Sequence, residues 1–198
     1  MRYLLLALFS LGLFTACGPG NTPNLKSAND PSGDAKGKTG TNWDLLRVEA
    51  VRQDDTLVLK LGFVQEVKLP PPGETADASQ LTAYIALDTD QKASSDDQQL
   101  RGILTLGSTC SSLSGSNLGV EYLVELFDRN ANGNYPVLGP GATSSGEATP
   151  RAEGQTLTLS LPLSVLGNPQ GSANLGMDVG NGKENTDCFP DQGVFALP

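Results

Sequence analysis

The sequence has 198 residues, and 22 acidic side chains against 13 basic ones give a formal net charge of −9 at pH 7. An acidic chain without a basic cluster is a poor partner for nucleic acid and is not drawn by charge to anionic lipid. The chain has no histidine, which excludes the commonest general base and the usual serine–histidine–aspartate triad. These features favour a non-enzymatic binding or structural protein.

Residues 1–20, MRYLLLALFSLGLFTACGPG, have the pattern of a secretory signal peptide. Arg2 supplies a positive charge, and the apolar run at residues 4–14 is too short to span a bilayer, which needs about 20 residues. Two small residues then precede Cys17. This arrangement resembles the lipobox of bacterial lipoproteins, although Phe14 stands where leucine is commoner. The alternative is an ordinary signal peptide that happens to contain a cysteine.

The lipobox resemblance implies cleavage before Cys17, a diacylglyceryl thioether on its sulfur, and usually acylation of its amino group with a fatty acid such as palmitate. More than one acyl chain anchors a protein stably, because each buried methylene contributes ~0.8 kcal/mol. We therefore expect a lipid-anchored, extracytoplasmic protein of the cell membrane or the outer membrane. The lipid, and not charge, would hold it there.

Residues 17–42 are rich in Gly, Pro, Asn, Ser, Thr and Asp, and Leu25 is their only large apolar side chain. Such a segment cannot bury enough surface to offset its ordering entropy. We therefore expect a disordered tether with a reach of roughly 30 Å. The predicted organisation is a signal peptide at residues 1–16, a lipidated cysteine with its linker at 17–42, and one folded domain at 43–198.

Strand signals dominate the predicted domain. Apolar side chains recur with a period of two at residues 56–63, 81–87, 119–127 and 155–161, and residues 45–51 form a short strand segment that is β-branched towards its end. Weaker strand signals occur at residues 103–106, 135–138, 173–179 and 193–197. Pro136 lacks an N–H donor and so predicts an edge strand. Residues 163–167 predict a single helical turn or a tight bend, and no ten-residue segment shows a convincing helical period.

Eight to ten short strands separated by Gly, Pro, Asn and Asp turns predict an all-β fold, an antiparallel β-sandwich of the jelly-roll type. The phrases YIALDTDQ, GVEYLVEL, GQTLTLSLPLSVLG and TDCFPDQGVF occur in that order. Their order resembles the carbohydrate-binding family 9-like and DOMON-like β-sandwich modules of secreted bacterial proteins. The resemblance implies a non-catalytic binding module, with a glycan or an envelope protein as its partner.

The departures from these families are informative. Some DOMON modules hold haem through Met and His, and a chain without His argues against haem. Family 9 modules stack sugars on aromatic rings, but Trp43 is the only tryptophan, and several Phe and Tyr residues fall on strand faces where they belong to a core. No sugar-binding residue is therefore assigned. The alternative function is a structural envelope lipoprotein without a small ligand.

With Cys17 assigned to the lipid, two cysteines remain, Cys110 and Cys188. Two thiols outside the cytoplasm predict one disulfide. The alternative is a pair of free buried thiols.

Calcium is the one cofactor that suits this composition, because it takes oxygen ligands from Asp, Asn and backbone carbonyls. The stretch from Asp128 through Asn130 and Asn132 to Gly133 matches the first half of a calcium loop. Position 12 of such a loop would be Gly139 instead of glutamate. The alternative for this stretch is an Asn-Gly hairpin turn.

The second candidate calcium site is Asp88 and Asp90, which follow the apolar run at residues 81–87. Residues two apart on a strand point to the same face, so the two carboxylates would repel each other unless a cation or N–H groups compensate. Lys92 or Arg101 could supply that charge, and Asp96, Asp97 and Asp187 could join from other loops. The alternative is a loop start whose carboxylates accept backbone N–H groups.

Overall fold

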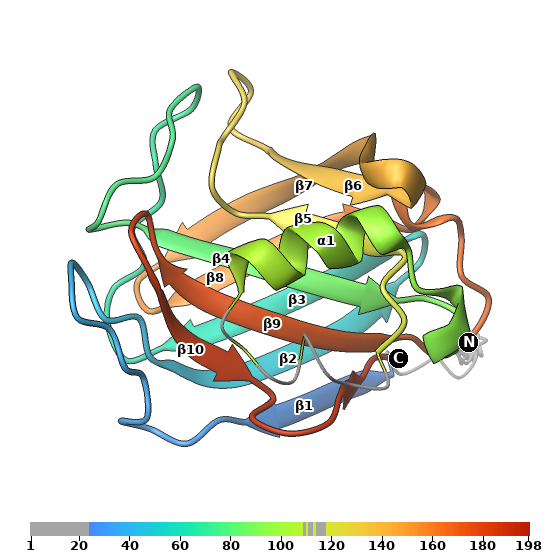
Figure 1. Ribbon diagram of the computed structural model, residues 1–198, viewed down its shortest axis with the longest axis horizontal. Helices are drawn as coiled ribbons and strands as arrows, with labels where there is room; N and C mark the ends of the chain where they lie inside the picture. The colour runs from blue at the N-terminus through green and yellow to red at the C-terminus, as the bar shows by residue number, and fades with distance from the viewer. Residues whose placement is uncertain (1–23, 109, 111–112, 114–117) are drawn as a thin grey trace, which may run out of the picture.

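A computed structural model of the protein describes residues 24–108, 110, 113 and 118–198 (Figure 1). All strand pairs are antiparallel and form one curled 11-stranded sheet in the order β1-β2-β3-β8-β7-β6-β5-β4-β9-β10, with β11 added beside β9. This confirms the predicted all-β antiparallel fold. The predicted lipidation residue Cys17 lies outside the described residues.

Secondary-structure bounds are as follows. The strands are β1 (Leu25–Asn29), β2 (Leu45–Gln53), β3 (Thr56–Phe63), β4 (Leu81–Asp88), β5 (Tyr122–Glu125), β6 (Tyr135–Gly139), β7 (Thr143–Glu153), β8 (Thr156–Pro162), β9 (Asn174–Asn181), β10 (Asn185–Phe189) and β11 (Phe195–Ala196). The helices are α1 (Gln98–Gly107) and the short 3₁₀ turns η1 (Ala93–Ser95), η2 (Pro140–Ala142) and η3 (Leu163–Leu166). In the described part of the chain, no helix is long and apolar enough to cross a membrane.

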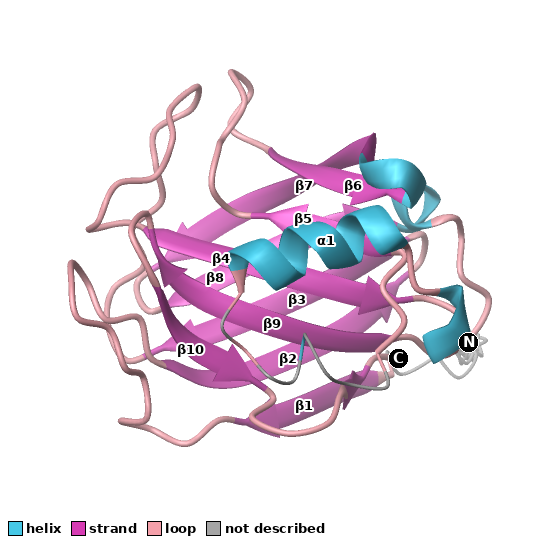
Figure 2. Cartoon of the chain, in the orientation of Figure 1, coloured by secondary structure: helices cyan, strands magenta, loops and turns pink. Residues whose placement is uncertain are grey.

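The sheet becomes a sandwich because β7 belongs to both of its layers. The first half of β7 pairs with β6, where Ala148 lies opposite Tyr135, and the second half pairs with β8, where Thr149 lies opposite Ser160. One layer contains β1, β2, β3 and β8, and the other contains β6, β5, β4, β9 and β10 (Figures 1 and 2). The two ends of the curled sheet, β1 and β10, therefore lie at one open edge of the sandwich.

The main core fills the space between the two layers. The inward-facing residues of β3, Leu57, Leu59, Leu61 and Phe63, are at most 4% exposed, as the period-two pattern predicted. Trp43 is fully buried in this core and contacts Phe63 edge-on, with 5.9 Å between the ring centroids. The only tryptophan is therefore a packing residue.

A second, smaller core covers the outer face of β4 and β5, where α1 crosses the sheet (Figure 2). Asp97 caps this helix by accepting the N–H groups of Gln99 and Leu100, and Leu100 and Leu104 are buried one turn apart. The prediction that no ten-residue helix exists is therefore wrong, and so is the strand expected at residues 103–106. Only a few apolar side chains mark the buried face, so the helical period was weak.

The structure also corrects the predicted tether. Residues 25–29 form strand β1, which pairs with β2 along its whole length, and the chain up to residue 42 is placed along the edge of the sandwich. The disordered linker is therefore wrong for residues 24–42, and the folded domain begins before residue 43. An edge strand is held mainly by backbone hydrogen bonds, so β1 needs few apolar side chains. Ala28 is the side chain of β1 that packs against the main core.

The predicted edge strand at residues 135–138 needs correction as well. Strand β6 lies between β5 and β7, so it is internal. Pairing with β5 involves Val137 and Leu138, whereas Pro136 pairs only with Glu147 on the β7 side. The missing N–H of Pro136 is tolerated because the ladder on one side has not yet begun at that residue.

Candidate metal centres

The disulfide predicted between Cys110 and Cys188 is present, with the two Cα atoms 5.5 Å apart. It ties the segment after α1 to strand β10 on the outer face of the sandwich. Cys110 is buried, and its sulfur also lies 3.6 Å from the carbonyl oxygen of Asp187. The bond therefore fixes one end of the outer core beside an acidic residue of β10.

The predicted calcium loop at Asp128, Asn130 and Asn132 has the geometry of a turn. The side-chain oxygen of Asn130 accepts the N–H groups of Asn132 and Asn134, each at 3.0 Å. Gly133 adopts a positive φ of 81°, which favours glycine. The oxygen that a cation would need is thus already shared by two backbone N–H groups, which favours the turn interpretation for this loop.

Asp88 and Asp90 do come together at the end of β4, and Glu121 joins them. One carboxylate oxygen from each of the three lies within 4.8 Å of the others. We call Asp88, Asp90 and Glu121 the β4-end cluster. Asp88 is fully buried and Asp90 is exposed, so the cluster runs from the protein interior to the surface. The sequence reasoning placed the two aspartates together but missed Glu121, which is near neither in sequence.

The protein itself supplies several donors to the β4-end cluster. Asp88 accepts the N–H of Gly119 at 3.3 Å and the amide of Asn174 at 3.2 Å through Oδ2, while its buried Oδ1 has no hydrogen-bond partner. Asp90 accepts the N–H of Lys92 at 2.9 Å, and the Lys92 ammonium lies 3.5 Å from its other oxygen. The expected compensation by Lys92 is therefore present.

The other residues expected to join this site have different roles. Arg101 forms an ion pair with Asp96 at 2.9 Å, and Asp97 caps α1. Asp187 does not join the β4-end cluster but belongs to a second acidic cluster on β10. The two clusters are separate, and only the first was predicted.

The second cluster consists of Asp30, Asp34 and Asp187, whose carboxylate oxygens also converge within 4.8 Å. We call these three residues the seam cluster, because Asp30 follows β1 and Asp187 lies on β10, the two ends of the curled sheet. Asp34 lies in the turn after β1. The cluster therefore bridges strands that do not neighbour each other in the sheet order.

The seam cluster is poorly supplied with donors. Asp30 is 8% exposed, and its buried Oδ2 has no hydrogen-bond partner among the residues that the structure describes; the same is true of one buried oxygen of Asp34. Asp187 is the exception, since it accepts the N–H groups of Leu45 and Cys188, both at 2.8 Å. Asp44 adds a fourth carboxylate nearby, which accepts the N–H of Gly33 at 2.9 Å and leaves Oδ1 buried without a partner.

Burial and mutual repulsion change the acidity of this cluster. Burial, followed by the charges of Asp187, Asp34 and other nearby aspartates, raises the pKa of Asp30 to about 8. Burial also raises the pKa of Asp187 to about 6, although the N–H groups that it accepts oppose the shift. The pKa of Asp34 is raised as well, chiefly by burial. Three carboxylates forced together without enough donors are the electrostatic situation that a bound cation relieves.

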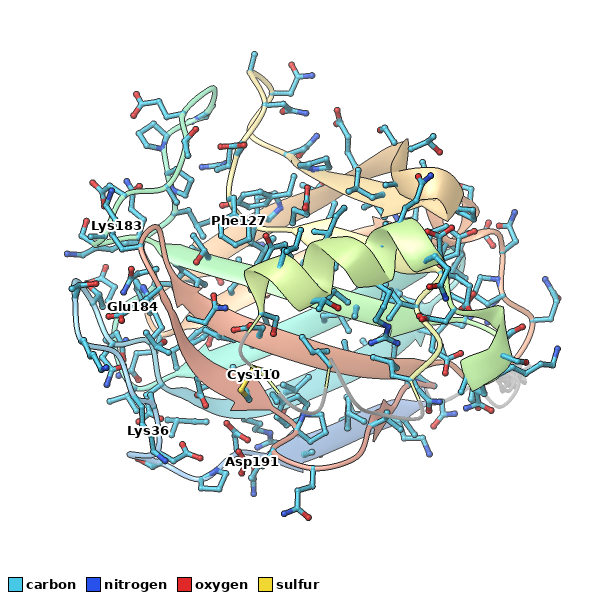
Figure 3. The ribbon with its side chains drawn as sticks, in the orientation of Figure 1. Lys36, Cys110, Phe127, Lys183, Glu184 and Asp191 are labelled. Atoms are coloured by element: carbon cyan, nitrogen blue, oxygen red, sulfur yellow. A yellow bond between two sulfur atoms is a disulfide. The ribbon has the colours of Figure 1, made fainter. Side chains whose placement is uncertain are left out.

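A surface cavity of about 240 Å³ opens beside the seam cluster. Its lining includes Asp34, Lys36, Asp187 and Asp191. Figure 3 shows Lys36, Asp191 and Cys110 together at the edge where β10 ends. The cavity gives water and ions access to carboxylates that are otherwise mostly buried.

The sequence does not predict the seam cluster, because residues 17–42 have the composition of a tether. One signal was present in NDPSGD, where Asp30 and Asp34 flank a Pro-Ser-Gly turn. Nothing in the sequence around Asp30 and Asp34 predicts that Asp187 joins them, because Asp187 lies more than 150 positions further along the chain.

No known protein-family model matches this sequence, and no curated protein sequence matches it. The resemblances to bacterial lipoproteins and to secreted sandwich modules therefore stay predictions that depend on the motifs themselves.

Proposed function

We propose that the protein is a lipid-anchored, extracytoplasmic lipoprotein of the bacterial cell envelope, whose β-sandwich is a non-catalytic binding or interaction module. The anchor would be the lipid on Cys17, as the lipobox resemblance implies. The partner would be an envelope protein or a glycan. The chain's charge and lack of histidine argue against nucleic acid and haem as ligands.

The observation that carries this proposal is the disulfide between Cys110 and Cys188. Stable disulfides belong to oxidising compartments and are rare in the cytosol. A secretory signal at residues 1–16 and a disulfide in the folded domain are independent features, and both are expected of an exported protein. They support the extracytoplasmic location more strongly than either does alone.

The alternative, a structural envelope protein without a small ligand, is favoured by the placement of the aromatic rings. Leu25, Val64 and Leu106 are the exposed large hydrophobic residues of the described chain, and none of them is aromatic. Sugar binding by stacking needs an exposed ring, and Tyr84, Tyr122 and Phe127 are only partly exposed, so a protein partner fits the surface better than a stacked glycan. Both proposals describe a protein of the cell envelope.

Calcium at the β4-end cluster belongs to the same proposal. Asp88, Asp90 and Glu121 offer an all-oxygen set with one fully buried, unpartnered oxygen, which suits a hard cation. The competing charge of Lys92 and the protein donors to Asp88 make this a weak site. It would fill only at the millimolar calcium concentrations found outside cells.

The test of the anchor is a Cys17→Ser variant expressed in the native host. We expect the wild-type protein to sediment with membranes and to resist extraction by salt, and we expect the variant to be released into the soluble fraction. A Cys110→Ser variant serves as the matched control, since it removes a different cysteine and should leave the protein at the membrane. A Cys17→Ser protein that still sediments with membranes would contradict the lipid anchor.

A further inference from the structure

We propose that the seam cluster is a calcium site, in which Asp30, Asp34 and Asp187 hold a cation that fastens the N-terminal segment to β10. The site goes beyond the proposed envelope function and does not depend on it. It is also distinct from the β4-end cluster, which comes from other strands and other loops.

The first argument for a calcium site is the geometry of the carboxylate oxygens. One oxygen from each carboxylate converges within 4.8 Å of the other two, a spacing that suits a shared ion. Asp30 and Asp187 are more than nine-tenths buried, and Asp30 presents an oxygen that no donor in the described part of the chain reaches. A buried polar atom without a partner is costly, so a bound group is the simplest explanation for keeping it.

The second argument is the excess of negative charge around the three carboxylates. Asp44 and Asp191 add negative charge around the three ligands, and they help to raise the pKa of Asp30. The only basic residue in the cavity lining is Lys36, which is exposed and takes part in none of the ion pairs found among the described residues. The protein thus assembles several carboxylates with little positive charge beside them, because Lys36 offsets only part of the effect of burial and of the neighbouring aspartates on Asp34.

The donor set favours calcium over other metals. All available ligand atoms are oxygens, whereas zinc prefers nitrogen or thiolate ligands, and the nearby Cys188 is already in the disulfide. Calcium takes 6–8 oxygens at flexible geometry, while magnesium demands a near-ideal octahedron and keeps several waters. Carboxylates from two separate segments, the stretch that contains Asp30 and Asp34 and the strand that contains Asp187, fit the more tolerant ion, with water entering through the cavity of about 240 Å³.

The position of the site suggests what the ion does. The segment after β1 already contacts β10 through the N–H of Lys36, which donates to the carbonyl of Thr186 at 2.7 Å. The hydroxyl of Thr186 donates to the carbonyl of Trp43 at 2.8 Å, just before β2. A cation held by Asp30, Asp34 and Asp187 would close the open edge of the sandwich at the same place. The N-terminal segment would then leave the domain at a fixed point instead of as a loose tether.

The experiment is a thermal melt of the full-length chain in detergent solution, with calcium chloride or with chelator. At a calcium concentration 100 times the dissociation constant, we expect the Tm of the wild type to rise by roughly 5–10 °C, since only the folded state binds. The Asp34→Asn variant should lose most of this rise. Asp34 is half-buried and accepts no hydrogen bond from another residue in the described structure, so this variant should fold. Asp187→Asn is a second variant, checked for folding by its intact disulfide.

The matched control is Asp55→Asn, which removes the same charge from an exposed turn between β2 and β3 and should keep the full calcium effect. Magnesium chloride at the same concentration should raise the Tm of the wild type by less than calcium does. The proposal is wrong if millimolar calcium leaves the Tm of the wild type unchanged. It is equally wrong if Asp34→Asn and Asp187→Asn both fold and keep the full rise in Tm.

Discussion

The seam cluster and the β4-end cluster contain the same chemistry, three carboxylates within 4.8 Å, but the protein surrounds them differently. At the β4 end, Asp88 and Asp90 accept backbone N–H groups, and Lys92 contributes a positive charge. Among the described residues, two members of the seam cluster, Asp30 and Asp34, keep a buried oxygen without a hydrogen-bond partner, whereas at the β4 end only Asp88 does. The two clusters therefore have carboxylates at a similar spacing, but they differ in how many hydrogen-bond donors the protein supplies to those carboxylates.

This difference suggests how acidic clusters should be interpreted. Carboxylates that accept N–H groups can serve a loop without any ion, as Asp97 does at the start of α1. Carboxylates that are buried together without donors must either bind protons or bind a cation. By this criterion the seam cluster is the stronger candidate for a metal site, although the sequence pattern favoured the β4 end.

The largest expected effect comes from the disulfide, because it ties the seam to the outer core. Cys188 follows Asp187, and Cys110 begins the segment that leads to Gly119, whose N–H reaches Asp88. Replacing both cysteines by serine should lower the free energy of unfolding by about 4 kcal/mol, from the entropy of a loop of this length. Urea denaturation with calcium held constant measures the loss. A change below about 1 kcal/mol would mean that the bond adds little constraint to the unfolded chain.

A second prediction compares one aspartate from each cluster. Asp187→Ala leaves the buried N–H of Leu45 and the half-buried N–H of Cys188 without an acceptor, so it should cost about 2–4 kcal/mol of unfolding free energy. Asp88→Ala removes two longer hydrogen bonds and should cost about 1–2 kcal/mol. Chemical denaturation of both variants in chelator tests the order. A larger loss of unfolding free energy for Asp88→Ala than for Asp187→Ala would contradict this prediction, because Asp88 would then contribute more to stability than Asp187.

A third prediction concerns pH in the absence of metal. The pKa of Asp30 is about 8 in the folded protein and 3.8 for a free aspartate, and that of Asp187 is about 6. A group with a raised pKa stabilises the fold below its unfolded pKa, and this stability is lost as pH rises through the folded value. The Tm of the calcium-free protein should therefore fall between pH 4 and about pH 8.

The controls for this pH effect are two Asn variants. Asp30→Asn removes the titrating group and should make the fall in Tm shallower, whereas Asp90→Asn should leave it unchanged. The comparison with Asp90→Asn also accounts for the general self-repulsion of an acidic chain. An unchanged slope in the Asp30→Asn variant would show that the seam is not the source of the pH dependence.

The smallest expected effect is that of Asp90→Asn on stability. Asp90 is exposed, and its ion pair with Lys92 is a surface interaction, so the loss should stay within about 1 kcal/mol. Thermal melts at low and high salt measure it, and the difference should shrink as salt screens the pair. A loss of unfolding free energy well above about 1 kcal/mol would mean that Asp90 stabilises the fold more than its exposed position suggests.

The parts of the fold that were predicted correctly share one property. Strands β3, β4 and β8 bury alternate side chains in the main core, so their period of two is visible in the sequence. Strands β1 and β7 were missed because they pair chiefly through backbone groups, and their side chains are mostly exposed. Backbone pairing leaves no pattern of apolar residues, so it could not be predicted from one sequence.

The same difference explains which residues of the two acidic clusters could be predicted from the sequence. Asp88 and Asp90 were found because they follow a strand that the pattern identified. The seam cluster needed the fold, since Asp30 and Asp187 come from opposite ends of the domain and meet only because the sheet curls. Glu121 is a similar case, brought to Asp88 by the pairing of β5 with β4. Both groups of carboxylates meet because strands that are far apart in the sequence pair with each other, and the residues next to each carboxylate in the sequence do not reveal this.

The most direct test of the seam site is terbium luminescence, with terbium as a luminescent substitute for calcium. Trp43 is the only tryptophan and directly precedes Asp44, and its carbonyl accepts the hydroxyl of Thr186, next to Asp187. Excitation of Trp43 should therefore sensitise terbium at the seam, and added calcium should displace the signal. We predict that Asp34→Asn abolishes the emission and that Asp90→Asn retains it. Emission that persists in Asp34→Asn and disappears in Asp90→Asn would contradict the assignment of the cation to the seam.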